Sequence, residues 1–94
     1  MGTYMALVDV RDTVQNVQKL ASVWGDVRNE IHDLDGELLD AYAVLGEHDY
    51  LVLFEAPNRE QALKMSLVVE RRGLDMQTME IIPVERFGEL VEDF

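Results

Sequence analysis

Residues 37–54 read ELLDAYAVLGEHDYLVLF, and this stretch decides the fold. Residues 37–45 predict one strand, and the polar break Gly46-Glu47-His48-Asp49 is typical of a short turn. Residues 50–54, YLVLF, are apolar at every position. A strand that is apolar on both faces needs a covering layer on each face. The stretch therefore predicts a β-hairpin within a sheet that is covered on both sides.

The chain before this hairpin predicts a strand followed by a long helix. Residues 3–10 form an apolar run typical of a strand, and residues 14–34 carry apolar side chains at spacings of three and four. Asp12 or Thr13 can cap this helix, and Gly25 predicts a bend or a division into two helices. The apolar stripe comprises Val14, Val17, Leu20, Ala21, Trp24, Val27, Ile31 and Leu34.

The chain after the hairpin predicts a second helix, a fourth strand and a short terminal helix. Asn58 is the expected N-cap, with Gln61 at the capping-box position, and Gly73 ends the helix. Residues 75–82 read as a strand that Pro83 ends. In residues 84–94 one face is apolar, which predicts an amphipathic helix that needs a groove on its own domain or on a partner. That face comprises Val84, Phe87, Leu90, Val91 and Phe94.

The order of these elements predicts an α+β, ferredoxin-like βαββαβ fold with a four-stranded antiparallel sheet and a short C-terminal helix. We expect a single domain over residues 1–94, since this length suits one small core. Two helices cover only one face of such a sheet. The second apolar face therefore predicts a homodimer in which two sheets pair face to face.

Composition excludes several classes of function. The 19 acidic residues against 8 basic ones give a net charge of −11, which opposes binding to nucleic acid or to an anionic membrane. Neither a membrane span nor a signal peptide is visible, so we expect a cytoplasmic protein. Lysine occurs only at Lys19 and Lys64, and a carboxylate-rich, lysine-poor surface suggests a halophilic protein as an alternative to an ordinary acidic one.

Six short segments give the chain a resemblance to the GYD domain family, small bacterial and archaeal proteins of unassigned function. The resemblance covers nearly the whole chain and implies a ferredoxin-like fold of the dimeric α+β-barrel type. The family motif reads Gly, any residue, Tyr, Asp, and His48 stands here at the tyrosine position. The family often has a proline-containing loop where this chain has residues 18–21. The segments are Thr3-Tyr4, Val14-Gln15-Asn16-Val17, Gly36-Glu37-Leu38, Gly46-Glu47-His48-Asp49, Glu55-Ala56-Pro57 and Pro83-Val84-Glu85-Arg86-Phe87.

A second resemblance concerns the middle of the chain. The effector-binding domain of leucine-responsive regulators is similar in having a turn like residues 46–49, an apolar strand, a Glu-Ala-Pro segment and then a helix. This resemblance implies an effector-binding module. Its first helix is usually shorter than residues 14–34.

Few residues of this chain have the chemistry that a site requires. His32 and His48 are the only two histidines, and His32 is expected on the polar face of its helix. His48 beside Asp49 could transfer protons, although an Asp in a turn more often binds the turn's own backbone. With no cysteine and two distant histidines, neither a metal site nor a cofactor is expected, and the scattered glycines form no phosphate loop.

Aromatic residues could line a ligand cavity. Tyr4, Trp24 and Tyr42 could surround an apolar small molecule, with His48 and Asp49 as the polar groups, although strand and helix spacing also explains the aromatic side chains as core. We therefore expect a homodimeric module that binds or senses a small molecule. The alternatives are a cofactor-independent monooxygenase or isomerase acting on a small apolar substrate, and a structural protein whose tail docks on a partner.

Overall fold

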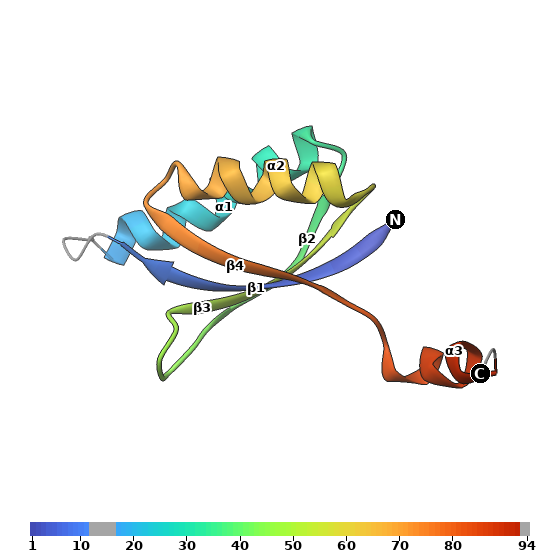
Figure 1. Cartoon of the computed structure of the whole chain (residues 1–94). Coiled ribbons are helices and arrows are strands. Elements are labelled where there is room, and N and C mark those ends of the chain that lie inside the picture. Colours follow the sequence, from blue (N-terminus) through green and yellow to red (C-terminus); the bar gives the residue numbers. More distant parts are fainter. Residues whose placement is uncertain (12–16, 93–94) are drawn as a thin grey trace.

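The computed structural model describes residues 1–11 and 17–92, with the backbone alone described for residues 17–21. The chain forms one four-stranded sheet, and Figure 1 shows helices packed over one of its faces. The elements are β1 (Gly2–Val10), α1 (Val17–Asp33), β2 (Glu37–Ala43), β3 (Tyr50–Ala56), α2 (Arg59–Glu70), β4 (Leu74–Ile81), a 3-10 turn η1 (Val84–Arg86) and α3 (Phe87–Val91).

The sheet confirms the ferredoxin-like prediction. Its strand order is β2-β3-β1-β4, and each neighbouring pair is antiparallel. In the centre of the sheet Met5 lies opposite Leu53 on one side and Met79 on the other. Helices α1 and α2 both lie over the same face (Figure 1), so the opposite face of the sheet is open in this chain.

The core lies between the sheet and the two helices. Alternate residues of β1 and β3 point into it, and Tyr4 stacks on Phe54 with ring centroids 5.5 Å apart. This burial of apolar area is the main stabilising contribution to such a fold. The buried apolar residues are Tyr4, Ala6, Val8, Val27, Ile31, Leu38, Val52, Phe54, Ala56, Ala62, Met65, Val69 and Leu74.

Helix α1 differs in one respect from the prediction. It continues through Gly25 as one helix, so the expected division into two helices is wrong. A glycine costs only about 1 kcal/mol in a helix, and the burial of Val27 and Ile31 outweighs that cost. The expected start at residue 14 and the expected cap at Asp12 or Thr13 lie outside the described residues.

Strand β2 is shorter than predicted. It ends at Ala43 rather than at Leu45, because the backbone N–H of Val44 donates to the carbonyl of Asp49 and so closes the hairpin. Leu45 is fully exposed. The hairpin itself, β2 paired with β3, is as predicted.

Beyond β4 the chain extends away from the sheet and from α1 and α2 (Figure 1). The predicted terminal helix is present as η1 and α3, and the main contacts of α3 are with η1. It lies beyond the end of β4, on the side of the sheet away from α1 and α2 (Figure 1). Its apolar side chains are exposed, and the predicted contribution of Phe94 lies outside the described residues.

No helix in the described part of the chain is both long enough and apolar enough to cross a membrane.

Candidate functional site at one end of the open sheet face

The open face of the sheet has an apolar centre. Register places Leu7 opposite Leu51, and Met5 opposite Leu53, on the face that turns away from the helices. These side chains are half-buried, although no helix covers this face. A contiguous apolar patch of this kind marks an interaction surface or a ligand surface. The half-buried apolar residues of this face are Met5, Leu7, Leu51, Leu53, Met79 and Ile81.

His48 lies at one end of this face and is paired with Asp9. The imidazole Nδ1 is 3.1 Å from Oδ2 of Asp9, and the His48 side chain is 28% exposed. Asp9 shares its face with Met5 and Leu7, because side chains two apart in a strand point the same way. The pair therefore forms a polar end to the apolar surface.

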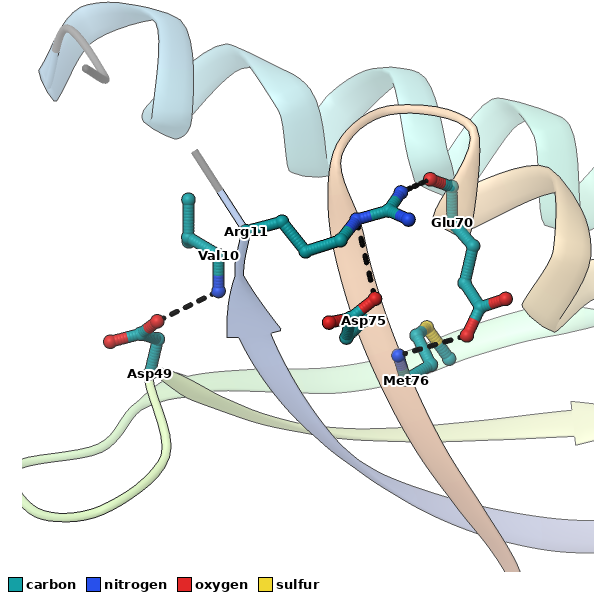
Figure 2. Close-up of polar contacts among 6 residues, drawn as sticks. All are labelled: Val10, Arg11, Asp49, Glu70, Asp75 and Met76. Carbon is teal, nitrogen blue, oxygen red and sulfur yellow. Dashed lines mark hydrogen bonds and ion pairs between the residues drawn. The ribbon is translucent and has the colours of Figure 1, made fainter. Parts of the chain in front are cut away.

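Asp49 has a different role from the one expected for a turn residue. Its carboxylate accepts a hydrogen bond of 2.8 Å from the backbone N–H of Val10, as Figure 2 shows. Its own backbone N–H donates to the carbonyl of Val8 at 2.9 Å. Asp49 therefore binds the end of β1, rather than the backbone of its own turn, and holds the turn against that strand.

Arg11 joins three elements beside this site (Figure 2). Its Nε is 3.2 Å from Oδ1 of Asp75, and its guanidinium also donates to the carbonyl of Glu70 at the end of α2. The carboxylate of Glu70 accepts from the backbone N–H of Met76 at 3.3 Å. Since Asp75 lies opposite Asp9 in the sheet, Arg11 offsets part of the negative charge at this end.

The sequence-predicted residues divide between the two faces of the sheet. Tyr4 is buried in the core, and Trp24 packs edge-on against Tyr50 with ring centroids 5.1 Å apart. Tyr42 lies opposite Leu51 on the open face and is 52% exposed. The structure therefore places Tyr42 with His48 on one face and does not bring Tyr4 or Trp24 to them. The positions of Tyr4 in its strand and of Trp24 in its helix had already indicated that both side chains pack in the core.

Sequence reasoning did not find Asp9. Its pairing with His48 spans 39 positions, so no local motif could link the two residues. A carboxylate within the apolar run of the first strand was the available signal, because a strand seldom places a charge at a half-buried position without a partner.

The other histidine lies elsewhere. His32 is exposed, as predicted, and it borders a hollow of about 370 Å³ at the other end of the β2–β3 hairpin, beside Gly36 and Glu55. Among residues 1–11 and 17–92, no group of three or more His, Asp or Glu side chains is placed to hold a metal ion.

Comparison with known proteins identifies the family. A family model described as the GYD domain matches residues 4–91. The chain belongs to the GYD domain family. In this GYD domain the histidine at the motif's tyrosine position is the residue that pairs with Asp9.

The fold also occurs in a regulatory protein of known structure. The GYD domain is similar to the Mycobacterium tuberculosis leucine response regulatory protein LrpA, with a TM-score of 0.63 and 13% sequence identity. The similarity covers 88% of this chain and 51% of the LrpA chain, so the GYD domain spans about half the length of that protein. At this identity the likeness concerns the fold. No curated protein matches the sequence significantly.

Proposed function

We propose that this GYD domain is a homodimer that binds a small molecule between its paired sheets. The observation that carries the proposal is the half-buried His48–Asp9 pair at one end of the open sheet face, whose centre is apolar. Apolar walls with a few convergent polar groups are the usual composition of a small-molecule site.

Pairing of the two open faces follows from the distribution of apolar side chains. The helices α1 and α2 occupy the other face, so they do not cover the half-buried rows around Leu7 and Leu53. A two-fold axis places the same patch of each copy against the other and covers both patches at once. The dimer therefore buries in one step the surface that a single copy leaves open.

The polar end of the face suggests the chemistry of the ligand. A carboxylate can only accept, so the Nδ1 of His48 is the donor to Asp9, and in the neutral ring this tautomer has Nε2 as a hydrogen-bond acceptor for a ligand. The Tyr42 hydroxyl is a further polar group on the same face. The chemistry suits a small, largely apolar molecule with a hydroxyl or amino group that donates to His48.

Native mass spectrometry at high ammonium acetate concentration tests both parts together. We expect an assembly of twice the 10.8 kDa chain mass that retains a small additional mass. A monomer would disprove the dimer, and a dimer that retains nothing and binds no member of a library of apolar alcohols and amines would disprove the ligand site.

Two matched pairs of variants test the dimer and the ligand site separately. Leu51→Glu places a charge in the proposed interface, and we expect the dimer dissociation constant to rise by roughly 100-fold. Leu45→Glu, at a fully exposed loop position, is the control and should leave the dimer dissociation constant unchanged. His48→Gln should release the retained molecule while the dimer persists, whereas His32→Gln should keep it.

The same pair supports a second function. A carboxylate that orients a histidine ring is the arrangement of a general base with its positioning partner. The second candidate is therefore a cofactor-independent enzyme of the monooxygenase or isomerase type, acting on a small apolar substrate. Incubation with the identified ligand distinguishes the two functions, because only an enzyme converts it, and His48→Gln would then abolish conversion.

The LrpA-like fold favours a sensing role for the binding module, in the manner of an effector-binding domain. In that case ligand binding should change the assembly state or the hydrogen exchange of the dimer. A bound ligand that leaves both unchanged would contradict sensing.

A further inference from the structure

Strand β4 forms one edge of the sheet, and no strand of the described residues lies on its outer side. It pairs with β1 over eight consecutive positions without a register shift. The other edge strand, β2, is irregular between Leu38 and Asp40. β4 also contains neither lysine nor proline, two residue types that commonly protect an exposed edge. The outer side of β4 therefore offers a regular row of backbone donors and acceptors to another strand.

One side chain occupies the beginning of this edge. The backbone N–H of Met76 donates to a carboxylate oxygen of Glu70 at 3.3 Å, so it faces away from β1 (Figure 2). Backbone groups of an edge strand alternate in direction, so those of Thr78 and Glu80 face outward as well. Since Glu70 takes the Met76 N–H, the outward groups of Thr78 and Glu80 remain for pairing.

Helix α2 leaves two leucines exposed beside the same edge. Leu63 and Leu67 lie one turn apart and are 61% and 53% exposed. Leu63 lines a hollow of about 260 Å³ between α2 and β4, together with Thr78 and Glu80. The charge of Glu80 is neutralised within the chain, because Arg59 lies 3.1 Å from its carboxylate. The free side of β4 and the exposed leucines thus form one surface, here called the β4–α2 edge.

A second copy of the chain covers both parts of the β4–α2 edge at once. Strands lie about 4.8 Å apart and packed helices about 8–10 Å apart, so one helix spans two strands. In this chain α1 and α2 cover the four strands in that proportion. A second β4 paired edge to edge therefore brings its own α2 to packing distance, with the leucines between the helices. A single extended peptide would pair with the backbone but leave the leucines in water.

We propose that β4 pairs antiparallel with β4 of a second copy, so that the two four-stranded sheets become continuous and α2 packs on the partner's α2. A two-fold axis perpendicular to the sheet keeps all the helices on one face. The free groups set the register, with Thr78 opposite the partner's Glu80 and the axis at Met79. A shift in one direction places two Glu80 side chains opposite each other, which is unfavourable. A shift in the other direction needs the Met76 N–H that Glu70 occupies.

This interface is separate from the open face, so sheet-paired dimers join through it without losing their own contacts. Only Thr78 and Glu80 of each strand exchange backbone hydrogen bonds, and a small interface is typical of weak association. We therefore expect pairs of dimers at high protein concentration, above the range in which the sheet-paired dimer is already complete.

Cross-linking at a single position tests the pairing, because a residue near a two-fold axis meets its own copy. Leu63 shares its hollow with Thr78 and Glu80, and the chain has no cysteine, so Leu63→Cys places a unique thiol near the axis. We expect a short bis-maleimide to give a covalent dimer of the full-length variant. Leu45→Cys, fully exposed in the β2–β3 loop, is the control and should give only the low yield of random encounters. Leu67→Cys is the second test position.

Sedimentation velocity separates the two interfaces. Leu51→Glu disrupts the pairing of open faces, and at high concentration we expect this variant to show a monomer–dimer equilibrium through β4. Adding Leu63→Glu should raise the dissociation constant of that equilibrium roughly tenfold or more, because it places a charge between the two α2 helices. Adding Leu45→Glu instead should leave it unchanged.

Hydrogen exchange followed by NMR tests the register. The amide protons of Thr78 and Glu80 should exchange more slowly as the concentration of the Leu51→Glu variant rises. The amide of Met76 is the internal control, because it already donates to Glu70 within one chain. Slowing at β2 instead of β4 would assign the association to the other edge.

Three results would overturn the edge pairing. They are equal cross-linking at Leu63 and Leu45, a Leu51→Glu variant that stays monomeric at every concentration, and exchange at Thr78 and Glu80 that does not depend on concentration. A wild-type dimer that Leu51→Glu dissociates would then leave the proposed function standing. Conversely, Leu63→Cys cross-links in a protein whose association Leu51→Glu does not weaken would support the edge pairing and disprove the paired open faces.

Discussion

Gly36 follows the two-residue turn Leu34-Asp35 after α1 and occupies a position where a side chain has no room. A Cβ there would lie 2.4 Å from Cε of Met65 and 2.6 Å from the carbonyl oxygen of Glu55. Its backbone N–H also donates to the carbonyl of Ile31, which ends the helix. The glycine therefore lets the end of α1 approach both α2 and β3.

Gly36→Ala should consequently destabilise the domain. We expect a loss of about 1–3 kcal/mol in the free energy of unfolding, measured by urea denaturation, because Met65 and the backbone must move. Gly25→Ala is the control: no atom lies within 4 Å of its Cβ position, and the helix should gain about 1 kcal/mol. Equal effects of the two substitutions would contradict the close packing at Gly36.

Asp49 gives a second prediction for a single residue. Asp49→Ala removes the acceptor for the Val10 N–H and should cost about 1 kcal/mol in urea denaturation. Asp49→Asn retains an acceptor oxygen and should cost less than half as much. If alanine and asparagine behave alike, the hydrogen bond does not stabilise the end of β1.

At the scale of the element, Gln61 of α2 makes both a local contact within its helix cap and a tertiary contact with the end of α1. Asn58 caps the helix as predicted, and its side chain accepts from the backbone N–H of Gln61 at 2.8 Å. The Gln61 side chain instead donates to the carbonyl of Leu34 at 3.1 Å. The capping-box residue therefore connects α2 to the end of α1.

Asn58→Ala should cost about 1 kcal/mol of stability, because the N–H of Gln61 loses its acceptor. Thermal unfolding followed by circular dichroism measures the loss. Asn58→Asp, which keeps the acceptor and adds a negative charge at the helix N-terminus, should retain the wild-type stability. A destabilised Asp variant would show that the side-chain amide matters beyond capping.

At the scale of the whole molecule, the net charge of −11 predicts a dependence on salt. Self-repulsion opposes folding, and the screening length falls from about 10 Å at 0.1 M salt to about 3 Å at 1 M. We expect the Tm to rise by about 5 °C or more between dilute buffer and molar KCl. Sucrose at matched osmolality is the control, since it strengthens apolar burial without screening charge. A Tm independent of KCl would contradict the halophilic interpretation.

The open face shows where sequence reasoning stops. The all-apolar stretch at residues 50–54 predicted that both faces of the sheet carry apolar side chains, and the structure has Leu51 and Leu53 on the open face. The candidate site could be predicted only in part. His48 was identified because histidine is rare in this chain, whereas its partner Asp9 lies on another strand.

The sequence by itself determined the order of strands and helices, the hairpin, the cap at Asn58 and the family, because these depend on neighbours a few positions apart. Only the tertiary structure decided which side chains meet. It sends Tyr4 and Trp24 to the core, joins His48 to Asp9 and places α3 away from its own helices. The physical reason is that strand register and packing bring together residues whose separation along the chain carries no periodic signal.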